Sequence, residues 1–178
     1  VSDLLGDAPG GHEIWYQKHM THHLLPNYSR DWIPQLANIL LIRDPAEVVA
    51  SYVKSRATVT PEDIGIPQQR KLHEEIIAAT GKAAPIIDAG DFLKSPRAYL
   101  QTICDHLGIA FTERMLHWPA GRRSSDGVWA PHWYAAVEAS TGFEAWRARE
   151  TSLSGEALKV AENCRQDYEF LYDRRWVL

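Results

Sequence analysis

NILLIRDPAEVVASY, residues 38–52, predicts a buried strand that runs directly into a helix. Its apolar run at 39–42 is typical of a strand covered on both faces. Asp44 followed by Pro45 is typical of a helix start. Arg43 therefore lies between the two elements, at the carboxyl end of the strand. Ligands bind at this edge in open α/β sheets, so the segment indicates both a fold and a binding site.

Arg43 and Ser51 are suited to bind a phosphate group. A guanidinium forms bidentate, charge-assisted hydrogen bonds with phosphate oxygens, and a helix N-terminus also favours an anion. The structural alternative is that Arg43 pairs with a nearby carboxylate and that Ser51 is simply a small helix residue. The spacing of the two residues alone leaves both interpretations open.

The chain has 178 residues, a length that suits one α/β domain over residues 1–178. Its net charge of -4 argues against a nucleic-acid partner, because nucleic-acid binders normally carry a basic surplus. No apolar run approaches the ~20 residues that span a bilayer, so we expect no membrane partner. The two cysteines predict neither a disulfide framework nor a zinc cluster, and the cytoplasm is the expected location. Oligomeric state is left open.

Strands alternate with helices along the chain. We expect strands at 13–18, 38–43 and 85–88, and helices at about 45–57, 68–81, 96–107, 132–141 and 154–173. A loop or short helix is expected at 26–37, and a proline-punctuated connection at 58–67. This alternation predicts a three-layer α/β fold with a mostly parallel sheet flanked by helices.

Lys18 ends the first predicted strand, and three histidines follow it: His19, His22 and His23. If the first two strands are neighbours, Lys18 and Arg43 emerge at the same edge of the sheet. A lysine can neutralise an anionic group, and histidine is the usual general base near neutral pH. The histidine spacing also suggests a metal site, but no carboxylate or cysteine accompanies it, so we expect no metal. The alternative for at least two histidines is a solvated or core position.

GRRSSDGVWAPHW, residues 121–133, is a candidate loop over a nucleotide. Arg122 and Arg123 would meet phosphates, and aromatic side chains such as Trp129 would stack on the base. The alternative is an ordinary surface turn anchored by buried tryptophans.

Four segments, taken in order, resemble the cytosolic-type sulfotransferases. They are YQKHMTHHLLP (16–26), LIRDPAEVVASY (41–52), PIIDAGDFLKSPRAYLQTICDHLGI (85–109) and RRSSDGVWAPHW (122–133). That family uses 3′-phosphoadenosine 5′-phosphosulfate (PAPS) as sulfuryl donor and has a P-loop-related α/β fold. More narrowly, the chain resembles a bacterial branch of sulfotransferase-like proteins, and a similar domain occurs fused to aminotransferase-like proteins in plants.

The resemblance implies how the donor is held. Arg43, Ser51, Arg122 and Arg123 would bind its 3′-phosphate, and Trp129 would shape the nucleotide side of the pocket.

The resemblance also implies catalytic residues for sulfuryl transfer to a hydroxyl or amine of a small-molecule acceptor. Lys18 would offset negative charge on the sulfuryl group. Either His22 or His23 would deprotonate the acceptor. We favour His23, which is nearest to the leucines and proline that follow.

One part of the family pattern is missing. Gly6 and Gly11 have the spacing of a phosphate-binding P-loop, but His12 and Glu13 follow where a lysine and a hydroxyl residue are required. We therefore expect the first strand and its phosphate loop to lie upstream of Val1. The 178-residue chain alone is then expected to be inactive or to bind the donor only weakly.

Two other functions remain open. A P-loop-like phosphotransferase or hydrolase would use ATP or GTP and an acidic Mg²⁺ ligand, for which Asp88 and Asp91 are the candidates. A non-catalytic nucleotide-binding module would bind nucleotide without turning it over.

Overall fold

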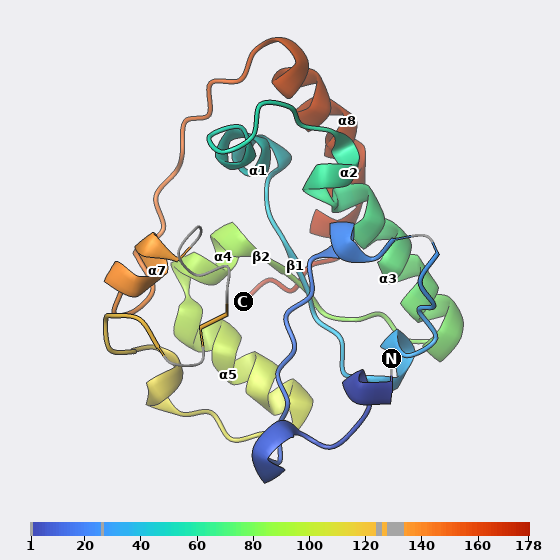
Figure 1. The fold of residues 1–178 in the computed structure, drawn as a ribbon, viewed down its shortest axis with the longest axis vertical. Helices are drawn as coiled ribbons and strands as arrows, with labels where there is room; N and C mark the ends of the chain where they lie inside the picture. Colours follow the sequence, from blue (N-terminus) through green and yellow to red (C-terminus); the bar gives the residue numbers. More distant parts are fainter. Residues whose placement is uncertain (1, 26, 124–125, 128–133) are drawn as a thin grey trace. The chain divides into compact units, whose positions relative to one another are not determined.

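The computed structural model describes residues 2–25, 27–123, 126–127 and 134–178. Contacts within the chain divide it into two compact units. Unit 1 comprises residues 1–89 and 148–177, and unit 2 comprises residues 90–147 with residue 178. Figure 1 shows the elements of both units in chain order.

Unit 1 contains a parallel pair of strands, β1 (Leu40–Ile42) and β2 (Ile86–Asp88). Leu40 lies opposite Ile86, and Ile42 lies opposite Asp88. Both strands lie within the apolar runs that predict them, and helices connect them, as parallel pairing requires. The α/β class is therefore confirmed.

The strand predicted at 13–18 is wrong, so the described part of the sheet has two strands and not three. The segment keeps a strand-like alternation, because Trp15 and Gln17 are half-buried whereas Ile14 and Tyr16 are 56% and 84% exposed. Aromatic and β-branched residues favour strands chiefly where they pack against a neighbouring strand. Among the described residues β1 pairs with β2, and this segment pairs with neither of them.

Helix α1 (Pro45–Tyr52) begins where the sequence predicts and ends earlier. Its N-cap is Asp44, whose carboxylate accepts a hydrogen bond from the Ala46 N–H at 2.8 Å. The other oxygen of the same carboxylate accepts one from Arg165 Nη1, on α8 (Gly155–Tyr172), at 2.7 Å. Burial acts to raise the pKa of Asp44, but the bonds from Arg165 and Ala46 outweigh it and lower the pKa.

Helices α2 (Pro61–Ile64) and α3 (Ile66–Thr80) are separated only by Gly65, whose φ of 77° suits glycine. The sequence predicts only a connection before α3, whereas the structure forms the extra helix α2 there. A capping box starts it: the Asp63 N–H donates to Thr60 Oγ1 at 3.3 Å, and the Thr60 N–H donates to the Asp63 carboxylate at 2.9 Å.

Helix α8 holds unit 1 together, because it contacts α1, α2, α3 and both strands. Figure 1 shows α2, α3 and α8 side by side. Both strands, α1 and α8 contribute core side chains with at most 1% exposure: Ile42, Val49, Ile86, Cys164 and Leu171. Short 3₁₀ turns precede β1 in the chain: η1 (Ser2–Leu4), η2 (Pro9–Gly11), η3 (Thr21–His23) and η4 (Ile33–Gln35).

Unit 2 contains the helix that the sequence predicts at 96–107. Its elements are α4 (Ala89–Lys94), α5 (Pro96–Leu107), η5 (Glu113–Met115) and α7 (Ala135–Ala139). The Phe143 ring packs against Phe92 and Trp118, each with ring centroids 5.1 Å apart. In the part of the chain that the structure describes, no helix combines the length and apolar character needed to cross a membrane.

Candidate functional site

Arg43 leaves the end of β1 and pairs with Glu47 in the first turn of α1. Arg43 Nε donates to Glu47 Oε2 at 2.8 Å, and Arg43 Nη2 lies 2.7 Å from the same oxygen. The side chains of Arg43 and Glu47 are 33% and 24% exposed. Arg43 therefore does pair with a nearby carboxylate, as the structural alternative expected. The guanidinium nevertheless remains accessible to an anion.

Ser51 lies on the face of α1 along which the Arg43 side chain extends. Glu47 and Ser51 are one helical turn apart, so they are neighbours on the helix surface. Because Arg43 contacts Glu47, its guanidinium lies on this same face. Ser51 is exposed. Arg43, through its contact with Glu47, and the exposed Ser51 therefore lie toward one face of α1, and Glu47 is the partner of the guanidinium there.

The turn η3 carries two of the candidate catalytic residues and is called the histidine turn below (Thr21–His23). The rings of His22 and His23 pack edge to face, with centroids 4.3 Å apart and planes at 76°. His22 is half-buried, whereas His23 is exposed. The chain reverses directly afterwards in an inverse γ-turn centred on Leu24, where the Leu25 N–H donates to the His23 carbonyl at 3.0 Å.

The charge state of His22 depends on groups from two elements. Burial lowers the pKa of His22, the neighbouring His23 lowers it further, and the Asp63 carboxylate on α2 opposes both effects. The overall shift is downward, so the His22 imidazole is neutral near pH 7. A neutral imidazole is the form that accepts a proton in general base catalysis.

Asp63 also connects the histidine turn with α1. Burial acts to raise the pKa of Asp63, but hydrogen bonds from Thr60 and Tyr52 and the charge of His22 lower it overall. Tyr52 is the last residue of α1, the helix that carries Ser51. Both α1 and the histidine turn contact α2. Helix α2 therefore lies against both candidate segments of unit 1.

Lys18 and His19 lie on the extended segment before the histidine turn, not at the end of a strand. Lys18 is exposed. His19 Nε2 lies 3.1 Å from Gln17 Oε1, and the His19 ring centroid is 5.3 Å from that of Trp32. The expectation that Lys18 emerges beside Arg43 depended on two neighbouring strands, and the first of these strands does not form.

Arg122 and Arg123 are exposed residues of unit 2. The N–H of Arg123 donates to the Asp126 carboxylate at 2.8 Å, and its guanidinium Nη2 donates to the Pro119 carbonyl at 3.4 Å. These bonds shape the described part of this loop. Trp129 lies outside the described residues.

Asp88 and Asp91, the candidate metal ligands of a phosphotransferase, both have protein partners. Asp88 is 6% exposed and accepts a hydrogen bond from the Tyr168 hydroxyl at 2.9 Å. Asp91 Oδ1 pairs with Lys94 Nζ at 2.8 Å. Within the described ranges, no group of three or more His, Cys, Asp or Glu residues is arranged to hold a metal ion.

The sequence did not indicate two residues that act on the histidine turn. Asp63 affects the pKa of His22, and Arg30 donates a hydrogen bond to the carbonyl of Leu24, directly after the turn. The pattern of Thr60 three positions before Asp63, with a proline between them, is a helix-start signal that could have predicted α2. No local pattern shows that Asp63 lies near His22. Arg30 likewise carries no local signal, because its partner Glu75 is 45 positions away.

Known proteins are similar in sequence to this chain over residues of both units. A family model described as "Sulfotransferase domain" matches residues 1–161. Two proteins of Arabidopsis thaliana, Branched-chain-amino-acid aminotransferase-like protein 2 and protein 1, are each 31% identical, over 171 and 143 residues. These alignments cover 96% and 80% of this chain but 30% and 25% of the relatives. The chain thus spans less than a third of the length of these relatives.

One solved structure is described as "Sulfotransferase Domain from the Curacin Biosynthetic Pathway". It is 20% identical, with 71% of this chain and 52% of that chain covered and a TM-score of 0.42. The family model, by contrast, matches most of this chain and includes the histidine turn, Arg43, Ser51 and the loop with Arg122 and Arg123. On the strength of that match, the chain belongs to the sulfotransferase-domain family.

Proposed function

We propose that the protein transfers a sulfuryl group from PAPS to a hydroxyl or amine of a small-molecule acceptor. One observation carries this proposal. Directly after the end of β1, Arg43, bonded to Glu47, and Ser51 lie toward the same face of α1, in a chain of the sulfotransferase-domain family. In open α/β sheets this edge binds ligands. We also propose that the fold is of the P-loop-related type and that the protein acts in the cytoplasm, where the buried free thiols Cys104 and Cys164 stay reduced.

The donor is distinguished from ATP by its 3′-phosphate. Arg43 and Ser51 would hold this phosphate through charge-assisted and hydroxyl hydrogen bonds, each charge-assisted bond contributing about 1.5–3 kcal/mol. Glu47 must then share the guanidinium with the phosphate or release it. The family resemblance adds Arg122 and Arg123 as further phosphate ligands and Trp129 as a contact on the nucleotide side.

The proposed chemical step needs one base and one cation. His22 accepts the proton of the acceptor as the acceptor oxygen or nitrogen bonds to sulfur. The bond between sulfur and the oxygen of the donor's 5′-phosphate breaks, and 3′,5′-adenosine bisphosphate leaves with that oxygen. Lys18 offsets the negative charge that develops on the leaving phosphate. The half-buried, neutral His22 fits the role of base better than the exposed His23 that the sequence favours.

The test is sulfuryl transfer by the full-length protein. ³⁵S-labelled PAPS would be incubated with a panel of small phenols, alcohols and amines, and γ-³²P-labelled ATP and GTP would be tested in parallel. We expect label only from PAPS, and a loss of roughly 10²–10⁴-fold in kcat for His22→Ala. His23→Ala should lose much less, and the exposed His12→Ala serves as the matched control.

Transfer of ³²P without transfer of ³⁵S would replace this proposal with the phosphotransferase alternative. Binding of nucleotide without transfer of either label would support the non-catalytic module.

A further inference from the structure

The histidine turn needs support from outside its own backbone. It is a single 3₁₀ turn whose N-cap residue, Met20, makes no side-chain capping bond. The extended segment before it belongs to no strand. Two backbone bonds close it, from the His23 N–H to the Met20 carbonyl at 2.9 Å and from the Leu24 N–H to the Thr21 carbonyl at 3.0 Å, and the Leu25 bond to the His23 carbonyl belongs to the γ-turn that follows. One turn with two bonds is marginal unless other side chains hold it.

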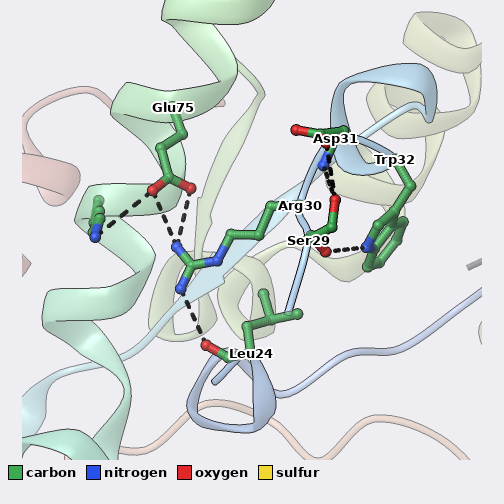
Figure 2. Close-up of polar contacts among 7 residues, drawn as sticks. Leu24, Ser29, Arg30, Asp31, Trp32 and Glu75 are labelled. Carbon is green, nitrogen blue, oxygen red and sulfur yellow. Dashed lines mark hydrogen bonds and ion pairs between the residues drawn. The ribbon is translucent and has the colours of Figure 1, made fainter. Parts of the chain in front are cut away.

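Arg30 supplies that support on one side of the turn. Its Nη2 donates to the carbonyl of Leu24, the residue directly after His23, at 3.1 Å. Its Nη1 donates to both carboxylate oxygens of Glu75 on α3, at 3.1 and 3.0 Å. Figure 2 shows the guanidinium between the Glu75 carboxylate and the Leu24 carbonyl. The guanidinium thus connects the turn with a helix of the core.

Both ends of this connection are anchored. Arg30 is followed by Trp32 and Ile33, which are 6% and 4% exposed. The Trp32 indole N–H donates to the carbonyl of Ser29 at 3.1 Å, also drawn in Figure 2. Glu75 lies on α3, which packs against α8. The side chains of Arg30 and Glu75 are 20% and 37% exposed, so the ion pair is partly shielded from solvent.

A second contact holds the other side of the turn. The Thr21 hydroxyl donates to the carbonyl of Gly65 at 3.0 Å. A side chain at Gly65 would collide with this contact, because an added Cβ would lie 2.6 Å from Thr21 Oγ1. Thr21 therefore places the start of the histidine turn against the junction of α2 and α3, near Asp63.

We propose that Arg30, held by Glu75, is a positioning residue that fixes the histidine turn so that the His22 imidazole keeps one orientation. Arg30 contacts neither histidine ring in the structure, so its effect acts through the Leu24 backbone. A misplacement of a catalytic group by about 1 Å can cost roughly 10²-fold in rate. The catalytic consequence rests on the proposed function, whereas the ordering of the turn does not.

The chain offers a matched control on the same helix. Arg70 of α3 donates to Asp167 Oδ1 of α8 at 2.8 Å, and the two side chains are 31% and 24% exposed. Arg70 also pairs with Glu74 at 3.3 Å and lies over the Phe170 ring, so Arg70→Ala removes contacts of α3 with α8 that do not involve the histidine turn. A general loss of stability should affect both variants alike, whereas a positioning effect should appear only in Arg30→Ala.

The first experiment records the imidazole ¹⁵N signals of His22 and His23 by NMR in the full-length protein. We expect Arg30→Ala to move both signals toward the values of the exposed His12, and Arg70→Ala to leave them unchanged. Arg30→Lys should not restore the wild-type signals, because an ammonium lacks the fork that reaches two acceptors at once. Glu75→Gln, a milder change, should shift the signals in the same direction if Arg30→Ala does not fold. Unchanged signals in folded Arg30→Ala and Glu75→Gln would overturn the proposal.

The second experiment measures steady-state kinetics with PAPS and an acceptor found in the transfer assay. We expect kcat of Arg30→Ala to fall by roughly 10- to 100-fold with KM for PAPS within about twofold, and Arg70→Ala to keep the wild-type kcat. An equal fall in both variants would show a stability effect and contradict positioning. If wild-type protein transfers no sulfuryl group, the proposed function fails, and the NMR result still decides whether Arg30 orders the turn.

Discussion

Arg43 donates from Nε and from Nη2 to a single carboxylate oxygen of Glu47, at 2.8 and 2.7 Å. The candidate phosphate-binding cation is therefore paired with an anion of its own helix. Partly exposed pairs of this kind contribute only about 0.2–1 kcal/mol, less than a charge-assisted bond to phosphate. A 3′-phosphate can compete for this guanidinium, and Glu47 sets how strongly it must compete.

Glu47→Gln should strengthen the binding of 3′,5′-adenosine bisphosphate. The substitution removes the competing charge, and 0.2–1 kcal/mol corresponds to an affinity gain of at most about fivefold. Isothermal titration calorimetry on the full-length protein measures it. Glu156→Gln is the control, since it removes an exposed carboxylate that pairs with Lys159. Weaker binding by Glu47→Gln than by wild type would show that Glu47 assists the site.

Asp63→Asn should lower the pKa of His22 still further. The Asp63 carboxylate favours the imidazolium, so its neutralisation favours the neutral ring. The amide oxygen of asparagine can still accept the hydrogen bond from the Thr60 N–H, which preserves the capping box at the start of α2. Titration of the His22 signal by NMR checks the shift, with the exposed Asp105→Asn as control. A rise in the pKa of His22 would contradict the assigned influence of Asp63.

Tyr168→Phe should destabilise unit 1 by about 1–2 kcal/mol. The Tyr168 hydroxyl donates to the buried Asp88 at 2.9 Å, and the substitution removes this donor from a carboxylate that is 6% exposed. Burial and the neighbouring Asp88 raise the pKa of Tyr168, so the hydroxyl keeps its proton at all ordinary pH values. Urea unfolding measures the loss. Tyr16→Phe, at an 84% exposed position, should change the free energy of unfolding little.

Stability should fall as pH drops below about 6.5, the ordinary histidine pKa. His73 on α3 is 2% exposed, and its Nδ1 has no hydrogen-bond partner among the described residues. Burial lowers its pKa, the nearby Arg174 lowers it further, and Glu74 opposes them. The unfolded chain therefore binds the proton more readily than the folded chain, which favours unfolding in this window.

Urea unfolding at about pH 7.5 and about pH 5.5 measures this loss. His73→Leu should reduce the pH dependence, and His22, whose pKa is also lowered, should account for part of what remains. An unchanged pH dependence in His73→Leu would exclude His73 as a cause.

The sequence predicts the strand-to-helix segment well because its signals are local. Asp44 caps α1, and the apolar runs before it and at 85–88 become β1 and β2. The strand at 13–18 could not be excluded from sequence, because strand formation depends on a neighbour that composition does not reveal. The sequence left open whether Arg43 binds a phosphate or pairs with a carboxylate, and it did not identify Glu47 as that carboxylate. The supports of the histidine turn, Arg30 and Asp63, depend on contacts between segments distant in the chain.

The central claim is that Arg43 recognises the 3′-phosphate of the sulfuryl donor. Isothermal titration calorimetry on the full-length protein would compare 3′,5′-adenosine bisphosphate with ADP, in wild type and in Arg43→Ala. We predict that wild type binds the bisphosphate at least about tenfold more tightly than ADP, equivalent to about 1.4 kcal/mol, and that Arg43→Ala abolishes this preference. Equal affinity of wild type for the two nucleotides, or an unchanged preference in Arg43→Ala, would contradict the claim.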